Sequence, residues 1–179
     1  ILPTGIGQLD KLLNGGFPRG RCILLTGSCG TRKSIFGIQF LVHGISDCNE
    51  NGILVTTEES PSAIKQNLKS FNCNLEELER EHKLGIIDVA TPKSRVAYTG
   101  RDQVTRLINM NTFLMTLTQV QKSIDAKRVV VDSIPGLELM IEDPAEIRHA
   151  VHRIIITSRE LGCTTLLVSE GRKRGDVSR

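Results

Sequence analysis

The architecture of the chain follows from one continuous run, Ile23-Leu24-Leu25-Thr26-Gly27-Ser28-Cys29-Gly30-Thr31-Arg32-Lys33-Ser34. Its first residues are apolar and typical of strands, so we expect a buried strand there. A loop that contains two glycines follows. Beyond Ser34 the apolar residues recur three and four positions apart, which predicts a helix. Strand, glycine-containing loop, Lys-Ser and helix stand in the order that a phosphate-binding loop requires.

The chemistry of this order predicts a nucleotide site. A helix start offers unpaired backbone amides and the positive end of the helix dipole, and a loop wrapped before it adds further amides around an anion. We expect Lys33 to reach the β- and γ-phosphates of ATP, and the hydroxyl of Ser34 to coordinate Mg²⁺. The predicted cofactor-binding residues of the loop are Gly27, Ser28, Cys29, Gly30, Thr31, Arg32, Lys33 and Ser34.

Arg32 departs from the pattern, because the residue before the lysine of such a loop is normally glycine. Glycine tolerates positive φ and lets the backbone approach a phosphate. The arginine can strain the loop, weaken nucleotide binding or add a charge from the solvent side, and the residues do not choose among these effects. The alternative to a phosphate site is a helix-initiating turn of similar sequence without a ligand.

Apolar runs alternate along the chain with segments of helical spacing, and Ser60-Pro61 and Asp143-Pro144 each predict a helix start. Because the runs are apolar throughout, they predict a three-layer α/β/α domain with a mainly parallel central sheet. Residues 91–101 lack periodicity and predict a loop, and 179 residues suit a single domain. The predicted strands are 22–26, 52–57, 84–89, 127–131 and 163–169, and the predicted helices are 35–45, 63–71, 104–124 and 147–161.

Polar residues end or follow three of these strands, at the edge where ligands of open α/β sheets bind. Asp132 ends an apolar run and is expected to hold the Mg²⁺ shell. Glu58 and Glu59 are adjacent acids, and we expect one of the two carboxylates to polarise a water for attack on the γ-phosphate. Ser169 is a candidate sensor of the γ-phosphate. The alternative roles are strand-end caps and a solvated acidic turn.

Composition restricts the class of protein. A net charge of +3 is too small to indicate a DNA-binding protein and does not exclude DNA as a partner. The five cysteines include no Cys-x-x-Cys pair, which argues against a disulfide framework or a zinc site. No apolar stretch approaches the roughly 18 residues that cross a bilayer, so we expect a cytoplasmic protein without a membrane partner.

Further motifs stand at the start of the chain and around the predicted site residues. They are Thr4-Gly5, Leu9-Asp10, Leu12-Leu13, Gly15-Gly16-Phe17-Pro18 and Gly20, then Thr57-Glu58-Glu59-Ser60-Pro61, residues 127–133 and residues 166–170. On these motifs the chain resembles the KaiC-type branch of the RecA-like ATPases over nearly its whole length. The resemblance implies ATP hydrolysis, with Glu58 as the base and Glu59 as its partner. It also implies a homo-oligomeric ring or filament, such as a hexamer, with sites at subunit boundaries.

Two departures from the family pattern limit this expectation. Arg32 puts ATP turnover in question more than ATP binding. The chain reaches Arg179 before the family's last strands and its Lys-x-Arg element, so we expect a domain without those strands and slow hydrolysis. The competing hypothesis is a nucleotide-dependent regulatory module, or a DNA-binding recombinase paralogue with little or no hydrolysis, and it rests on the basic residues Lys93, Arg95, Arg101 and Arg106.

Overall fold

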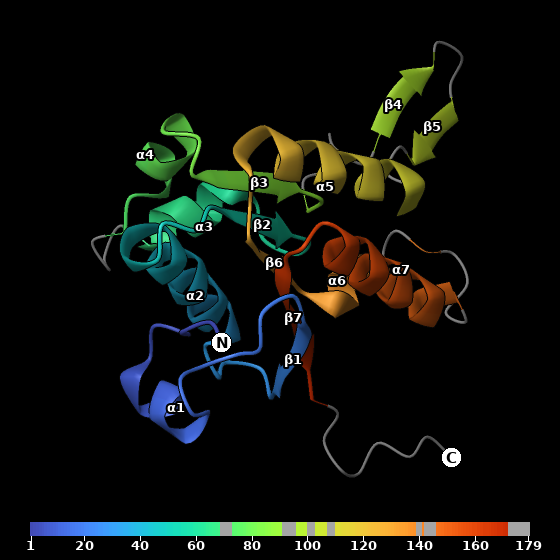
Figure 1. Ribbon diagram of the computed structural model, residues 1–179. Helices are drawn as coiled ribbons and strands as arrows, with labels where there is room; N and C mark the ends of the chain where they lie inside the picture. The colour runs from blue at the N-terminus through green and yellow to red at the C-terminus, as the bar shows by residue number, and fades with distance from the viewer. Residues whose placement is uncertain are drawn as a thin grey trace, which may run out of the picture.

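A five-stranded parallel sheet in the order β1-β7-β6-β2-β3 forms the centre of the computed structural model (Figure 1). The structure describes residues 1–68, 73–90, 96–99, 103–106, 110–138, 141 and 146–171. Each predicted strand is present and differs from its prediction by at most one residue at either end. The five strands are β1 (Cys22–Gly27), β2 (Gly52–Thr56), β3 (Leu84–Asp88), β6 (Arg128–Asp132) and β7 (Thr164–Glu170).

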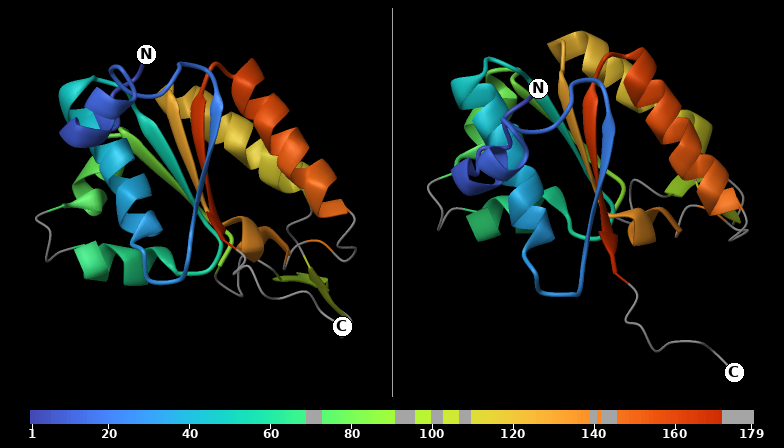
Figure 2. Two further views of the ribbon diagram at one scale, coloured as in Figure 1. Left: turned by 90° about the horizontal axis from the view of Figure 1, so that it is seen from below. Right: turned by 60° about the horizontal axis from the view of Figure 1, so that its bottom comes forward.

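Helices cover both faces of this sheet, which confirms the predicted three-layer arrangement (Figure 2). One face carries α2 (Lys33–Asp47), α3 (Pro61–Leu68) and α4 (Leu75–Arg80). The other face carries α5 (Met110–Ile124) and α7 (Glu146–Glu160). Two short helices complete the described helices, α1 (Gly7–Leu12) near the N-terminus and α6 (Ile134–Glu138) directly after β6.

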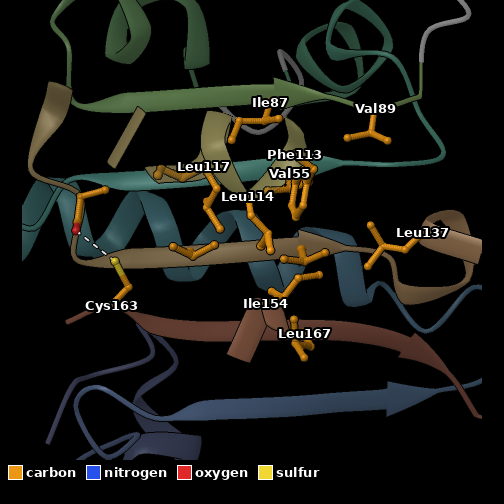
Figure 3. Close-up of a cluster of buried hydrophobic side chains, with 14 residues drawn as sticks. Val55, Ile87, Val89, Phe113, Leu114, Leu117, Leu137, Ile154, Cys163 and Leu167 are labelled. Atoms are coloured by element: carbon orange, nitrogen blue, oxygen red, sulfur yellow. Dashed lines mark hydrogen bonds between the residues drawn. The ribbon is translucent and has the colours of Figure 1, made fainter. Parts of the chain in front are cut away.

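The sheet separates two hydrophobic clusters. In a strand, successive side chains point to opposite faces. Val129 and Val131 of β6 therefore join the cluster under α5 and α7, whereas Val130 joins the cluster under α2. Figure 3 shows the first cluster, in which Phe113 of α5 and Ile154 of α7 pack near the strands. Burial on both faces explains why these strands read as continuous apolar runs.

The helix predicted over residues 104–124 is wrong at its start. Helix α5 begins at Met110, and Gln103–Arg106 instead form strand β5, which pairs antiparallel with β4 (Val96–Thr99). β4 lies within the stretch that we expected to be a loop. Val104 and Thr105 are β-branched and favour a strand, so local preference outweighs the helical spacing of the apolar residues at this point.

The short helices α1, α4 and α6 had no prediction, because five or six residues are too few to show a helical period. The predicted helix start at Ser60-Pro61 agrees with the structure, in which α3 begins at Pro61 and the Ser60 hydroxyl accepts a hydrogen bond from the Ala63 amide at 3.3 Å. The second predicted start, Asp143-Pro144, lies outside the described residues, as do Lys93, Arg95, Arg101 and the side chain of Arg106.

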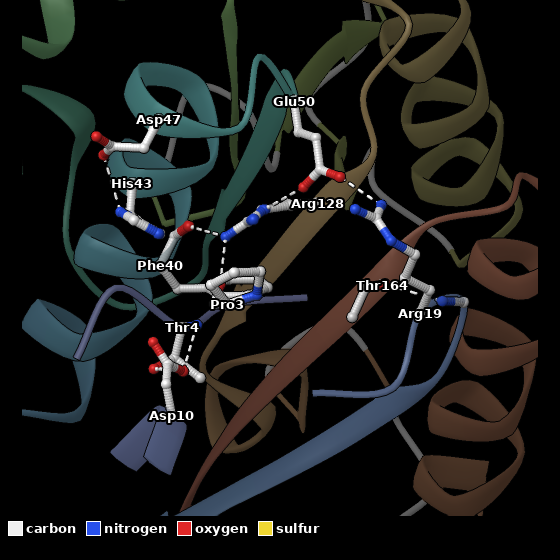
Figure 4. A network of polar contacts seen from close by, with 11 residues as sticks. Pro3, Thr4, Asp10, Arg19, Phe40, His43, Asp47, Glu50, Arg128 and Thr164 are labelled. Atoms are coloured by element: carbon white, nitrogen blue, oxygen red, sulfur yellow. Dashed lines mark hydrogen bonds and ion pairs between the residues drawn. The ribbon is translucent and has the colours of Figure 1, made fainter. Parts of the chain in front are cut away.

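A buried ion pair fastens the N-terminal segment to the sheet (Figure 4). Arg128, at the start of β6, is 0% exposed and donates from Nε to Glu50 at 2.8 Å. Its Nη1 donates to the carbonyl oxygens of Pro3 at 3.0 Å and Phe40 at 2.9 Å. A Cβ added at Gly44 would lie 2.5 Å from Arg128 Cδ, so glycine allows α2 to approach this side chain. One guanidinium thus joins β6, α2 and the N-terminal segment.

Strand β1 lies at an edge of the sheet and pairs only with β7 among the described strands. The side chain of Leu24 in the middle of β1 is 59% exposed, although the strand is otherwise part of an apolar sheet. No helix among the described residues is both long enough and apolar enough to span a membrane.

Candidate nucleotide site

A pocket of about 380 Å³ lies where the start of α2 meets the carboxyl ends of β2, β6 and β7. Most of the residues predicted from the sequence meet there. The predicted residues that line it are Cys29, Gly30, Arg32, Lys33, Ser34, Glu58, Glu59 and Asp132. Gly27, Ser28, Thr31 and Ser169 do not line it. For Ser169 the reason is the pleat of β7, because Val168 and Glu170 on either side face the pocket.

The side chain of Lys33 binds backbone carbonyl groups of the loop that precedes it. Its Nζ donates to the carbonyl oxygens of Gly27 at 2.8 Å and Ser28 at 2.9 Å. The hydroxyl of Thr31 also donates to the Ser28 carbonyl, at 2.8 Å. A Cβ added at Gly27 would lie 2.8 Å from Thr31 Oγ1, so this close folding favours glycine at position 27. The loop therefore has an internally bonded shape around the ammonium group.

Arg32 adopts the left-handed conformation, with φ 60° and ψ 32°, immediately before α2. Its carbonyl accepts the Phe36 amide at 3.1 Å, so this backbone position is part of the helix start. The conformation is one that glycine adopts without steric cost and that other residues adopt at a cost of about 1 kcal/mol. Strain in the loop, the first of the effects considered for Arg32, is thus present. The exposed side chain of Arg32 lines the pocket beside Lys33.

We expect Arg32→Gly to raise the free energy of unfolding, without nucleotide, by up to about 1 kcal/mol, because glycine removes the Cβ contact of the left-handed conformation. Urea denaturation measures this change. Arg32→Ala is the matched control, since it removes the charge but keeps the Cβ, and its stability should stay close to that of the wild type. Equal stability of the glycine and alanine variants would contradict the role of backbone strain.

Asp132 and Ser34 form the polar centre of the pocket. Both side chains line the pocket, Ser34 from the start of α2 and Asp132 from the end of β6. Burial raises the pKa of Asp132 above its ordinary value, the Ser34 hydrogen bond and nearby Lys33 lower this pKa, and the charges of Glu58 and Glu59 raise it, with a net upward shift. The carboxylate therefore sits where a bound cation would relieve both the loss of solvation and the repulsion from the two glutamates.

This shift predicts that Asp132 destabilises the fold at neutral pH. A raised pKa means that the folded chain binds the carboxyl proton more tightly than the unfolded chain does, so stability decreases as pH rises through the folded pKa. We expect Asp132→Asn, which keeps an acceptor for Ser34, to raise Tm at pH 7. The gain should shrink as pH falls toward the ordinary aspartate value of 3.8. Thermal denaturation from pH 7 downward measures it.

Asp47→Asn is the control for that experiment, because it removes the same charge from an exposed side chain on α2. It should change Tm little. A Tm of Asp132→Asn that is equal to or below the wild-type value at pH 7 would contradict the interpretation.

The two glutamates point to different elements. Glu58 Oε1 accepts a hydrogen bond from the Ser133 hydroxyl at 2.7 Å, which directs it toward the end of β6. Glu59 Oε2 lies 3.5 Å from Asn67 Nδ2 of α3, and the Glu59 carbonyl accepts from the Thr56 hydroxyl. The peptide bond between Asp132 and Ser133, opposite Glu58, is cis. The pair thus offers one carboxylate on the β6 side of the pocket and one on the α3 side.

The side-chain oxygens of Ser34 and Asp132 suit a Mg²⁺ ion whose remaining ligands are nucleotide phosphates and waters. Among the described residues, no three His, Cys, Asp or Glu side chains are grouped so as to hold a metal. Mg²⁺ commonly binds through one or two protein oxygens, several waters and substrate phosphates, and not in an all-protein cage. The side-chain oxygens of Ser34 and Asp132 are hard donors of this kind, in the same pocket as the lysine that would meet the phosphates.

The model of the KaiC ATPase family matches residues 2–178. The chain belongs to the KaiC family. Circadian clock oscillator protein KaiC from Prochlorococcus marinus (strain MIT 9313) is 34% identical over 169 residues, which cover 94% of this chain and 33% of that protein. Circadian clock protein KaiC3 from Synechocystis sp. is 32% identical over 180 residues, which cover 99% of this chain and 34% of that protein.

A solved structure agrees with this KaiC-family assignment. The KaiC-like protein from the hyperthermophilic archaeon Pyrococcus horikoshii OT3 superimposes with a TM-score of 0.82 at 34% identity, over 99% of this chain and 73% of that one. The present chain spans about a third of the length of the curated KaiC relatives. Family and fold together support a P-loop ATPase domain that binds ATP.

Four polar residues of the KaiC-family pocket are additional to the predicted site residues: Thr56, Asn67, Ser133 and Glu170. Glu170 ends β7 beside the predicted Ser169, and strict alternation along that strand could have pointed to it. Asn67 lies on a helix, and no sequence signal places its side chain over the pocket. Ser133 follows the predicted Asp132, but its partner Glu58 is 75 positions away in the sequence.

Proposed function

We propose that this KaiC-family chain is an ATP-binding domain that hydrolyses ATP slowly with Mg²⁺ and acts within a homo-oligomer. The observation that carries the proposal is the meeting of Lys33, Ser34 and Asp132 in one pocket, although Asp132 lies about a hundred residues from the other two. Cation, hydroxyl and carboxylate together suit a magnesium-bound polyphosphate. The ring or filament, such as a hexamer, rests on the resemblance to RecA-like ATPases, and the five free cysteines suit a cytoplasmic location.

In this proposal each side chain has a distinct task. Lys33 leaves the carbonyl groups of Gly27 and Ser28 and pairs with the β- and γ-phosphates, which the amides at the start of α2 also contact. Ser34 and Asp132 would hold Mg²⁺. When bound, Mg²⁺ neutralises charge that develops on the phosphate oxygens.

Glu58 acts on the attacking water. A water oxygen forms a bond to the γ-phosphorus while the bond from that phosphorus to the β–γ bridging oxygen breaks. The water gives a proton to the Glu58 carboxylate, and the leaving oxygen stays on ADP. Glu59 supplies a second carboxylate on the α3 side of the pocket. Strain at Arg32 favours a low rate.

Equilibrium binding of ATP and ADP, with and without Mg²⁺, tests this function. We expect the wild type to bind both nucleotides and Mg²⁺ to strengthen ATP binding. Lys33→Met should weaken ATP binding at least about tenfold, the loss typical of a charge-assisted contact. Lys127→Met is the matched control, because it removes a partly exposed lysine just before the opposite end of β6 and should leave affinity unchanged.

Phosphate release by the same samples separates the alternatives. Slow release that depends on Mg²⁺ supports hydrolysis. Binding without release would favour the nucleotide-dependent regulatory module over the ATPase. A wild type that binds no nucleotide at saturating ATP would rule out both.

A further inference from the structure

The ends of β2 and β6 are joined by a buried hydrogen-bonded connection between Thr57 and Ser133. The amide of Ser133 donates to Thr57 Oγ1 at 2.7 Å, and the Thr57 hydroxyl donates to the Ser133 carbonyl at 2.9 Å. The amide of Thr57 donates to the Asp132 carbonyl at 2.9 Å. Thr57 is 0% exposed and Ser133 is 4% exposed. None of these bonds uses the side chain of Ser133, so that side chain is not needed for the connection.

The hydroxyl of Ser133 serves a different partner. It donates to Oε1 of Glu58 at 2.7 Å, across the gap between the two strands. A glutamate has several rotatable bonds and loses conformational freedom when its carboxylate is fixed. A buried hydroxyl, itself held by a rigid backbone connection, can fix it at little further cost. Both residues line the pocket, so the bond sets where one carboxylate oxygen lies relative to Lys33 and Asp132.

We propose that Ser133 is a positioning residue for the hydrolysis proposed above, on which this inference rests. Its hydroxyl donates a hydrogen bond to Oε1 of Glu58, which leaves Oε2 available to accept a hydrogen bond from the attacking water. The water proton passes to Oε2 as the bond from oxygen to phosphorus forms, and Ser133 keeps its own proton. Ser133 contacts neither the nucleotide nor the metal in this role, so its effect belongs to turnover and not to binding.

Ser133→Ala tests the role, because alanine keeps the backbone bonds to Thr57 and removes only the hydroxyl. We expect kcat for phosphate release to fall roughly tenfold, as for a misplaced catalytic group, while KM for ATP and the Mg²⁺ requirement stay unchanged. Ser158→Ala is the matched control, a buried serine on α7 whose hydroxyl has no described partner, and its kcat should equal that of the wild type. Should Ser133→Ala fail to fold, Ser133→Cys, with a weaker donor, should show the same loss.

A double-mutant cycle with Glu58→Gln distinguishes positioning from a general structural effect. If Ser133 acts through Glu58, adding Ser133→Ala to Glu58→Gln should cause no further loss of kcat. An equal further loss would overturn the inference, as would a raised KM or Mg²⁺ requirement, which would indicate contact with the ligand. Normal kcat in Ser133→Ala would overturn the positioning role alone, whereas a wild type without phosphate release would overturn both the role and the proposed hydrolysis.

Discussion

Glu58→Gln is expected to lower the rate of phosphate release by about a hundredfold or more, while ATP affinity stays within a few fold of the wild-type value. Glutamine has the same shape, and its amide oxygen can still accept the hydrogen bond from Ser133. It cannot accept the proton of the attacking water, and general-base catalysis commonly contributes about 10²- to 10⁴-fold to a rate. Single-turnover phosphate release and equilibrium ATP binding measure the two quantities separately.

Glu59→Gln is the control for this experiment, because it changes the neighbouring carboxylate, which faces Asn67 of α3. Its effect on the rate should be clearly smaller. Equal rates for the wild type and Glu58→Gln would remove Glu58 from the mechanism. A larger loss in Glu59→Gln would exchange the roles of the two residues.

Arg128→Met is expected to lower the free energy of unfolding by about 3–5 kcal/mol, a large part of the stability of an ordinary domain. Methionine retains much of the apolar volume of the arginine but donates no hydrogen bond. The change deprives Glu50 of its buried partner and leaves the carbonyl groups of Pro3 and Phe40 without this donor. Urea denaturation with a constant m-value measures the loss.

Arg19→Met provides the comparison, since Arg19 pairs with the same carboxylate but its side chain is 58% exposed. Exposed ion pairs contribute under about 1 kcal/mol, so this variant should lose far less. Replacing both charges, by Arg128→Met with Glu50→Leu, should recover part of the loss, because no unpaired buried charge remains. An Arg128→Met variant within 1 kcal/mol of the wild type would show that the buried pair is not a main support of the fold.

Short apolar strands and the phosphate loop could be predicted from the sequence, because both depend on neighbouring residues. Local order alone placed β1, the loop and α2, and the shared carboxyl edge of parallel strands explains why Asp132 and Glu58 line one pocket. Arg32 could be recognised as a departure, but its left-handed backbone was visible only in the fold.

Contacts between distant segments could not be predicted. Arg128 and Glu50 are 78 positions apart, and the sequence shows an arginine in a strand without showing that a glycine on α2 makes room for it. The hairpin of β4 and β5 replaced part of an expected helix because the spacing of its apolar residues suits either structure. Ser169 was a candidate sensor of the γ-phosphate because it ends a strand. In the structure, side chains alternate along β7, and its neighbours Val168 and Glu170 line the pocket instead.

The ammonium group of Lys33 already has two carbonyl partners before any ligand arrives. An incoming phosphate must exchange these bonds for its own, so its net gain is only the difference between the two sets. In the proposed function, inorganic phosphate would have few other contacts to add to that difference, whereas a triphosphate would also engage the helix start, Ser34 and Asp132. The loop, whose carbonyl groups already bind Lys33, should therefore favour long phosphate chains over short ones in binding affinity, even before a base or sugar is recognised.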